Sequence, residues 1–273
     1  MRFENLKYFL FALSISFLLS CEEEIPEPVL SSAKVISSFS ISGENASINE
    51  SDKTISLTII ADDFTALVPT IAISDKASVS PASEIAQDFT NPVSYTVTAE
   101  DGSTTTYSAT VINGIVSFSH NAKNYEIVKE SKNWVDAAAF AVERGGILAE
   151  IDDLDEQNAI FAALENASIT PSKTVSPDGG GASYVWIGGN DLATEGNWIW
   201  DGNNDLTGAQ FWMGTQSGSV VNDLFNNWGD EPDDFGAGQD ALGLAITDWP
   251  LGVAGQWNDL EHTNKLYSVI ELD

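Results

Sequence analysis

The amino-acid sequence predicts a multi-domain chain in which an all-β sandwich is followed by an α+β domain. From Val35 to about Val111, apolar and polar residues alternate strictly, which is the pattern of half-buried strands. Beyond Asn113-Gly114 the pattern changes to two helical segments, followed by short strands rich in Trp. The 273 residues are enough for two domains with separate cores.

The N-terminus has the pattern of a secretory signal peptide over residues 1–20. Arg2 and Lys7 precede an apolar run from Tyr8 to Leu19, which is too short to span a bilayer comfortably. Cys21 follows, and because it is the only cysteine it cannot form an internal disulfide. Residues 21–33 are acidic and contain two prolines without a periodic apolar face, so they predict an extended tether.

Cys21 and the residues around it resemble a bacterial lipobox. The resemblance implies that Cys21 is acylated and becomes the mature N-terminus, so that lipid chains hold the protein at a membrane. Glu22-Glu23-Glu24 resembles the acidic signal of Bacteroidetes-type surface lipoproteins. We therefore expect a lipid-anchored, surface-exposed protein of the outer membrane, with a periplasm-facing location as the alternative.

Residues 34–112 predict an antiparallel β-sandwich of immunoglobulin-like type. Glu100-Asp101-Gly102 is a hairpin signal between two of its runs, and Asp62-Asp63 is interpreted as a turn rather than a ligand pair. The segment resembles the Ig-like modules of bacterial surface lipoproteins, which implies a spacer. The alternating apolar residues are Phe39/Ile41, Ile55/Leu57/Ile59, Ile71/Ile73, Val93/Tyr95/Val97 and Tyr107/Ala109/Val111.

Residues 115–273 begin with a predicted strand near Tyr125–Val128 and continue with two helices. The first covers 133–144, has apolar residues at helical spacing and ends at Gly145-Gly146. The second covers 153–164, with Asp153 as N-cap and Glu156 at the capping-box position. Short strands and long loops follow.

Composition and charge exclude several functions. The formal net charge is -30, with 41 acidic and 11 basic residues, so the Lys/Arg patches that bind nucleic acid are absent from the sequence. His120 and His262 are the only histidines, and no nucleophile motif stands out. Paired carboxylates here are better explained as cation ligands than as glycosidase acids, which need an apolar pocket. We expect a protein without enzymatic activity and without catalytic residues.

The segment from Asn227 to Asp259 is the richest in possible cation ligands. Glu231-Pro232-Asp233-Asp234 stands at one end and Trp257-Asn258-Asp259 at the other. Calcium takes six to eight oxygen ligands, and these residues supply carboxylates and amides. If the Glu231-Pro232 bond is cis, the bend would turn both acidic side chains toward one point.

These residues, in their order and spacing, resemble those of C-type lectin-like domains, over about residues 115 to 272. The resemblance implies that calcium is the cofactor and that a glycan binds it directly. It places the primary calcium site at Glu231, Asp233, Gln239, Asn258 and Asp259, and a second at Asp191, Glu195, Asp234 and Asp240. The motifs are Trp186-Ile187-Gly188-Gly189-Asn190-Asp191, Glu195-Gly196-Asn197-Trp198, Asn227-Trp228, Glu231-Pro232-Asp233 and Trp257-Asn258-Asp259.

Two positions depart from the sugar-binding pattern. The chain has Glu-Pro-Asp where that family has Glu-Pro-Asn or Gln-Pro-Asp, and Gln239 where a glutamate is usual. One sugar hydroxyl would then face two acceptors, Glu231 and Asp233, and the other would face two amides. The hypothesis is that the ligand is an acidic sugar. The alternative is a protein-binding adhesin module in which calcium is only structural.

The same resemblance has three further consequences. The usual disulfides are missing, one at Ala141 and Ile270 and the other near Ala241 and His262. The Gly- and Ser-rich insertion from about Leu206 to Val221 is expected near the calcium sites. The motif tryptophans are expected in the core rather than in the site: Trp186, Trp198, Trp200, Trp228 and Trp257.

Overall fold

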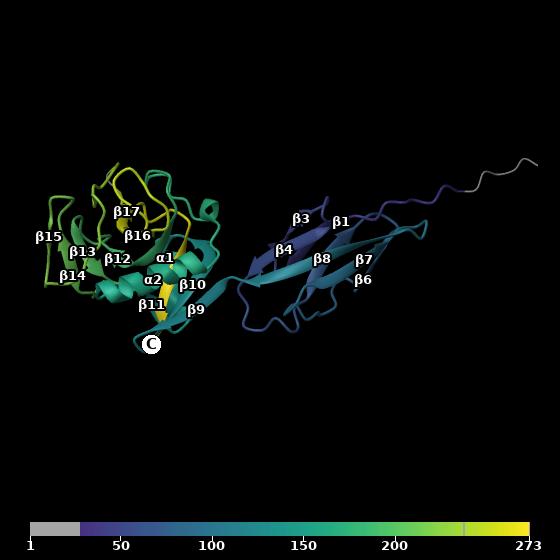
Figure 1. Ribbon diagram of the computed structural model, residues 1–273, viewed down its shortest axis with the longest axis horizontal. Helices are drawn as coiled ribbons and strands as arrows, with labels where there is room; N and C mark the ends of the chain where they lie inside the picture. Colours follow the sequence, from purple (N-terminus) through teal and green to yellow (C-terminus); the bar gives the residue numbers. More distant parts are fainter. Residues whose placement is uncertain (1–27, 237, 273) are drawn as a thin grey trace, which may run out of the picture.

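The protein consists of two modules joined at Gly114 (Figure 1). The structure, a computed structural model, describes residues 28–236 and 238–272. The predicted signal peptide, Cys21 and the acidic run after it lie outside the described residues. No helix in the described part of the chain is long and apolar enough to cross a bilayer.

The first module is all-β and consists of two sheets. One has the strand order β2-β1-β5 and the other β3-β4-β8-β7-β6. The predicted alternation is confirmed, because Phe39, Tyr95 and Tyr107 are fully buried between the sheets. The strands are β1 Ile36–Ile41, β2 Glu44–Asn45, β3 Ser47–Asn49, β4 Thr54–Ile59, β5 Pro69–Ile73, β6 Ser78–Ser80, β7 Val93–Thr98 and β8 Thr104–Asn113.

One strand pairing corrects the prediction of an antiparallel sandwich. β4 and β8 run parallel, with Ile55 opposite Ala109. Between them the chain crosses to the other sheet as β5 and returns as β6 and β7, which gives the length that a parallel crossover needs. The hairpin predicted at Glu100-Asp101-Gly102 is confirmed between β7 and β8. The immunoglobulin-like type remains a prediction.

The second module has two helices against one large sheet of order β15-β14-β13-β12-β18-β10-β9. In addition β11 pairs with β18, and β16 pairs with β12 and β17. The elements are β9 Ile115–His120, β10 Lys123–Lys132, α1 Trp134–Glu143, β11 Gly146–Leu148, α2 Leu154–Asn166, the 3-10 helix η1 Pro171–Lys173, β12 Tyr184–Asn190, β13 Asn197–Trp200, β14 Gln210–Met213, β15 Ser219–Val220, β16 Ala241–Ala245, β17 Trp257–Leu260 and β18 Leu266–Leu272.

Both helices begin at the predicted positions, with Asp153 as the predicted N-cap of α2 and Asn133 as the N-cap of α1. The Asn133 side chain accepts a hydrogen bond from the Asp136 amide, and that of Asp153 accepts one from the Glu156 amide, each at 2.8 Å. Glu156 bonds back to the Asp152 amide at 2.7 Å rather than to the N-cap amide. α1 ends before Gly145, whose φ of +85° suits glycine.

The core of the second module shows what replaces one of the missing disulfides. Ala141 on α1 and Ile270 on β18 are both fully buried in the same apolar cluster, so side-chain packing takes the place of a covalent link there. The five motif tryptophans are also buried, as predicted, with exposures of 0 to 8%.

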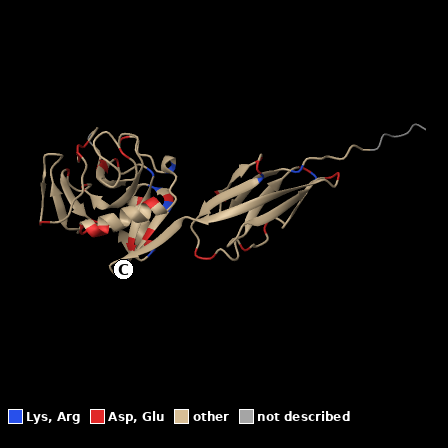
Figure 2. Cartoon of the chain, viewed as in Figure 1, with Lys and Arg blue, Asp and Glu red and all other residues tan. Residues whose placement is uncertain are grey.

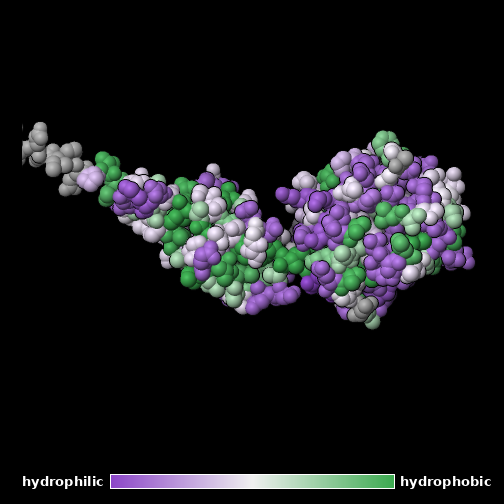
Figure 3. Space-filling model, turned by 180° about the vertical axis from the view of Figure 1, so that it is seen from behind, coloured by the Kyte–Doolittle hydropathy of each residue, from purple (hydrophilic) through white to green (hydrophobic). Residues whose placement is uncertain are grey.

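The two modules meet through a short connection. The Gly114 amide donates to Ile59 O, and the Lys129 amide donates to Gly114 O, each at 2.7 Å. Ile60 of the first module packs against the core of the second. Apolar residues gather at this connection (Figure 3), whereas Lys and Arg are sparse over the described residues (Figure 2).

Candidate functional site

Two groups of carboxylates lie at the ends of β12, β16 and β17. Glu231 and Asp233 come from the long loop between β15 and β16, and Asp259 lies on β17. Asp191 and Glu195 lie in the turn after β12, and Asp240 directly precedes β16. In each group the carboxylate oxygens approach within 4.8 Å of one another. The sheet pairing therefore brings together acidic residues that are far apart in the sequence.

The first group contains Glu231, Asp233 and Asp259. Glu231 and Asp259 are buried, while Asp233 is exposed. The Asp259 carboxylate accepts the backbone amides of Asp233 and Asp234 at 3.3 and 2.8 Å, which holds the loop against β17. The Glu231-Pro232 bond is cis. Glu231 Oε2 is buried and has no hydrogen-bond partner among the described residues.

The two amides predicted for this site differ in their availability. Asn258 Oδ1 is buried and has no partner in the described structure, so it is free to act as a ligand. Gln239 is engaged at both ends: its Oε1 accepts the Phe235 amide at 2.6 Å, and its Nε2 donates to Asp178 Oδ2 at 3.2 Å. The structure therefore brings Asn258 into the site with an oxygen that has no partner, and Gln239 with an oxygen that already accepts one hydrogen bond.

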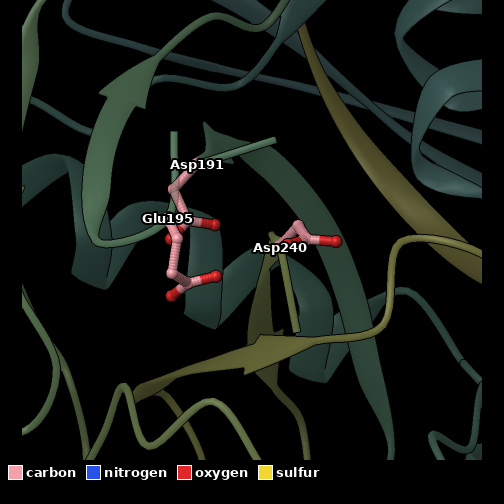
Figure 4. Close-up of side chains that lie close together, drawn as sticks. All are labelled: Asp191, Glu195 and Asp240. Carbon is pink, nitrogen blue, oxygen red and sulfur yellow. The ribbon is translucent and has the colours of Figure 1, made fainter. Parts of the chain in front are cut away.

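The second group contains Asp191, Glu195 and Asp240, whose side chains lie close together (Figure 4). Asp191 Oδ2 accepts the Gly196 amide at 2.7 Å, while Oδ1 is buried without a partner among the described atoms. Asp240 Oδ2 lies 3.1 Å from His262 Nδ1. This polar contact lies where the resemblance places the second missing disulfide, near Ala241 and His262.

Asp234, the fourth residue predicted for the second site, is not part of this convergent group. Its Oδ1 accepts the Gly238 amide at 2.7 Å, so its carboxylate closes the turn of its own loop. Its φ of +50° is part of that turn.

The electrostatics of both groups favour a cation. Burial, with the charges of Asp259 and Asp233, raises the pKa of Glu231 to about 8. Burial likewise raises the pKa of Asp191 to about 8, and that of Asp259 to about 7. Within residues 28–236 and 238–272, no Lys or Arg forms an ion pair with either group. Uncompensated buried carboxylates of this kind are stabilised by a bound cation.

A cavity of 310 Å³ adjoins the first group. Glu231, Asp233 and Asn258 line one side. Trp249, Pro250 and Leu251, from the hairpin between β16 and β17, supply apolar lining together with Pro177 and Phe235. Phe235 is 68% exposed, so its ring is accessible to a ligand in the cavity.

Three residues around this cavity were missed by sequence reasoning. The Asp178 carboxylate accepts hydrogen bonds from Ser176, Gln239, Asn264 and the Glu261 amide. Burial alone would raise its pKa, but these hydrogen bonds hold it below the ordinary value. Tyr184 contacts Asn258, and Trp249 contacts Glu231. No motif marks them, because their partners come from distant segments.

The predicted insertion of residues 206–221 supplies β14 and β15, and β15 is the edge strand of the sheet. The Gln216 side chain donates to Asp230 O at 2.9 Å, and the Gly214 amide donates to Gly196 O at 2.7 Å. The insertion therefore contacts residues next to Glu231 and Glu195, as expected.

Comparisons with known proteins agree with this architecture. A family model described as "Lectin C-type domain" matches residues 130–269, slightly more than half of the chain. A model described as "SGBP, N-terminal" matches residues 36–111.

Individual relatives are more distant. The galactose-specific lectin nattectin of Thalassophryne nattereri is 33% identical over 79 residues, which are 29% of this chain. The match spans 43% of nattectin, less than half of that relative's length. Human lithostathine is 18% identical, with 57% of this chain and 96% of that chain covered and a TM-score of 0.41.

The carbohydrate-recognition domain of the mouse scavenger receptor C-type lectin is 23% identical. It covers 57% of this chain and 95% of that domain, with a TM-score of 0.40. Similarity at this level says nothing about the function of this chain. On the match of the family model to residues 130–269, this chain belongs to the C-type lectin domain family.

Proposed function

We propose that the protein binds carbohydrate through calcium held at the first carboxylate group. The observation that carries the proposal is a set of buried oxygens without hydrogen-bond partners among the described residues: Glu231 Oε2, Asn258 Oδ1 and, in the second group, Asp191 Oδ1. Leaving such an atom unsatisfied costs about 1–3 kcal/mol, and more when it is charged. Three of them beside converging carboxylates suit a hard cation.

The donor set fits calcium. Glu231, Asp233, Asn258 and Asp259 supply carboxylate and amide oxygens, with room in the adjoining cavity for further oxygen ligands. When bound, the ion would supply direct coordination of two neighbouring sugar hydroxyls. Gln239 Oε1 accepts one hydrogen bond, from the Phe235 amide, and its second lone pair would complete the proposed set.

A second calcium is proposed at Asp191, Glu195 and Asp240. Its role would be to neutralise this group and hold the turn after β12 against β16. Asp234 accepts the Gly238 amide with Oδ1, so Oδ2 is the oxygen with which it would join this site.

The ligand class follows from which amide hydrogens remain free. Both Gln239 Nε2 contacts, at 3.2 and 3.4 Å, go to Asp178. Asn258 Nδ2 donates to Tyr184, so few donors face the cavity. An acidic sugar, our hypothesis from the sequence, needs these donors. A neutral sugar with a vicinal diol needs only the ion and the carboxylates. Galactose, named for nattectin, is therefore a useful first ligand beside uronic and sialic acids.

A second candidate function is protein binding with calcium only as a structural ion. The engagement of Gln239 by Phe235 and Asp178 favours it, because a ligand position of the sugar site is then occupied within the protein. Calcium would still order the loop that carries Glu231 and Asp233. Under this alternative calcium stabilises the fold, and no glycan binds.

The location is proposed from the sequence alone: a lipid anchor at Cys21 and exposure on the outer membrane. Replacement of Cys21 with serine is expected to move the protein from the membrane fraction to the soluble fraction. In a separate experiment, protease is added to intact cells that carry the protein with Cys21 in place. The protease should degrade the protein if it faces outward, and should leave it intact if it faces the periplasm.

The test of function is a glycan array with the purified protein, read in millimolar calcium and again in chelator. Binding that needs calcium, and that Glu231→Gln abolishes, is the expected result. Glu126→Gln is a matched control, because Glu126 is also buried but pairs with Arg144, in the helix-packed part of the module. Absence of glycan binding, with calcium-dependent stabilisation retained, would favour the protein-binding alternative.

A further inference from the structure

We propose that Tyr184 and Trp249 are positioning residues for the proposed calcium site. Trp249 holds one oxygen of Glu231, and Tyr184 holds the amide nitrogen of Asn258, so that the remaining oxygen of each side chain is presented to the ion. The inference rests on the proposed calcium binding. It adds the two residues that orient the Glu231 and Asn258 side chains toward the ion.

Trp249 fixes Glu231. The indole Nε1–H donates to Glu231 Oε1 at 3.0 Å, and both groups are largely buried. An indole N–H can only donate, so it selects one carboxylate oxygen and leaves the other free. The free atom is Glu231 Oε2, which has no partner in the described part of the chain. The carboxylate thus has one oxygen tied and one available.

Tyr184 fixes Asn258 by a similar restriction. The hydroxyl has a single hydrogen, which it donates to Gly179 O at 2.8 Å. It can therefore only accept from Asn258, whose Nδ2 lies 2.9 Å away. Rotation of the amide by half a turn would place two acceptors against each other. Asn258 Oδ1 must then face away from Tyr184, and it is the atom without a partner among the described residues.

The two rings support each other and fill a space made by glycines. Tyr184 and Trp249 pack edge to face with centroids 5.8 Å apart. A Cβ at Gly229 would lie 2.6 Å from the Trp249 ring, and one at Gly179 would lie 2.7 Å from the Tyr184 ring. A Cβ at Gly252 would lie 2.3 Å from the Trp249 ring. Three separate segments therefore leave room for these aromatic rings, which restricts their movement.

Such support determines how well the site is formed before an ion arrives. A ligand held by a neighbouring hydrogen bond does not have to be ordered when the metal binds. Loss of a supporting bond of this kind typically weakens metal binding by about 10- to 100-fold. We expect Trp249→Phe and Tyr184→Phe, which keep an aromatic ring, each to weaken calcium binding within this range.

The chain offers matched controls. Trp186 is fully buried, and its indole N–H donates to Lys132 O at 2.9 Å, away from both carboxylate groups. Tyr125 is fully buried, and its hydroxyl bonds to Glu156. Trp186→Phe and Tyr125→Phe remove the same chemical groups. They are expected to lower stability in chelator as much as the test variants, while leaving calcium affinity within about threefold of the original.

The experiment is a calorimetric calcium titration of the purified full-length protein and the four variants, with unfolding in chelator measured in parallel. A second reading follows the indole N–H signals of the eight tryptophans by NMR. The signal that disappears in Trp249→Phe should move most when calcium is added, and the signal lost in Trp186→Phe should stay in place.

The outcomes separate this inference from the proposed function. Calcium affinity that is unchanged in Trp249→Phe and Tyr184→Phe would overturn the positioning role and leave the calcium site standing. An equal loss of affinity in the two controls would also overturn it, because the effect would then be general destabilisation. If the protein without substitutions binds no calcium, both the inference and the proposed site fail. Should Trp249→Phe not fold, Tyr184→Phe decides.

Discussion

Replacement of Asp259 with asparagine is expected to stabilise the calcium-free protein at pH 8 and to remove its stabilisation by calcium. Asp259 is fully buried on β17 and shares the first carboxylate group with Glu231 and Asp233. In the absence of an ion its charge is uncompensated. Asparagine has nearly the same shape without the charge, so the substitution separates the electrostatic cost from the packing.

The magnitude follows from the pKa of Asp259. Burial, with the charge of Asp233, raises it from 3.8 to about 7. At about 1.4 kcal/mol per pKa unit, the ionised group costs the folded state ~4 kcal/mol. Asparagine accepts only one of the two backbone amides now bound, at a cost of about 1–3 kcal/mol. The calcium-free variant should therefore be about 1–3 kcal/mol more stable at pH 8.

The pH dependence has a definite sign. The folded protein keeps the Asp259 proton to higher pH than the unfolded chain does, so stability falls as pH rises. For the calcium-free protein this loss is absent below about pH 4, develops up to about pH 7 and remains above it. The variant should lack this contribution.

Chemical unfolding in chelator and in calcium, from pH 4 to pH 8, measures these effects. Calcium at 1,000 times its dissociation constant stabilises a folded protein by about 4.1 kcal/mol, so the order of stability should reverse when calcium is added. A variant that is less stable than the original in chelator, and that calcium still stabilises equally, would refute the reasoning.

Three further substitutions test the surroundings of the site. Gln239→Glu should change glycan preference, because a carboxylate cannot donate to Asp178 and adds a negative charge to the lining of the cavity, whereas Gln216→Glu on the neighbouring loop should not; an unchanged array would exclude Gln239 from a role in ligand preference. Asp178→Asn should cost about 1–3 kcal/mol of unfolding free energy above pH 4. That difference should shrink in acid, since hydrogen bonds hold the pKa of Asp178 below its ordinary value; a constant difference would contradict it. Phe235→Ala should weaken glycan binding while changing stability by less than about 0.5 kcal/mol, and unchanged binding would exclude Phe235 from the ligand contact.

The elements that sequence predicts best are those with strong local signals. The alternation of Ile55, Leu57 and Ile59 predicts β4, the helical spacing of apolar residues predicts α1, and Asp153 predicts the start of α2, because a cap or a period is a property of adjacent residues. The parallel pairing of β4 with β8 lacks such a signal. It depends on the route of the chain between the two sheets.

The candidate site shows the same limit. Glu231, Asp233 and Asp259 could be predicted because they lie in motifs, and the structure brings them together. Gln239 also lies at a motif position, yet its polar atoms bond to Phe235 and Asp178. Trp249 has no motif, since its role depends on a hydrogen bond to a residue 18 positions away. Such partners become visible only when the loops are folded.

The most direct test of the account is a crystal structure of the protein grown in calcium, with anomalous scattering used to locate the ion. The account predicts a calcium ion at about 2.3–2.6 Å from Glu231 Oε2, Asn258 Oδ1 and the Asp259 carboxylate, with an open side toward the cavity. A structure in which this group stays without an ion, while the protein binds its glycan elsewhere, would contradict the central claim.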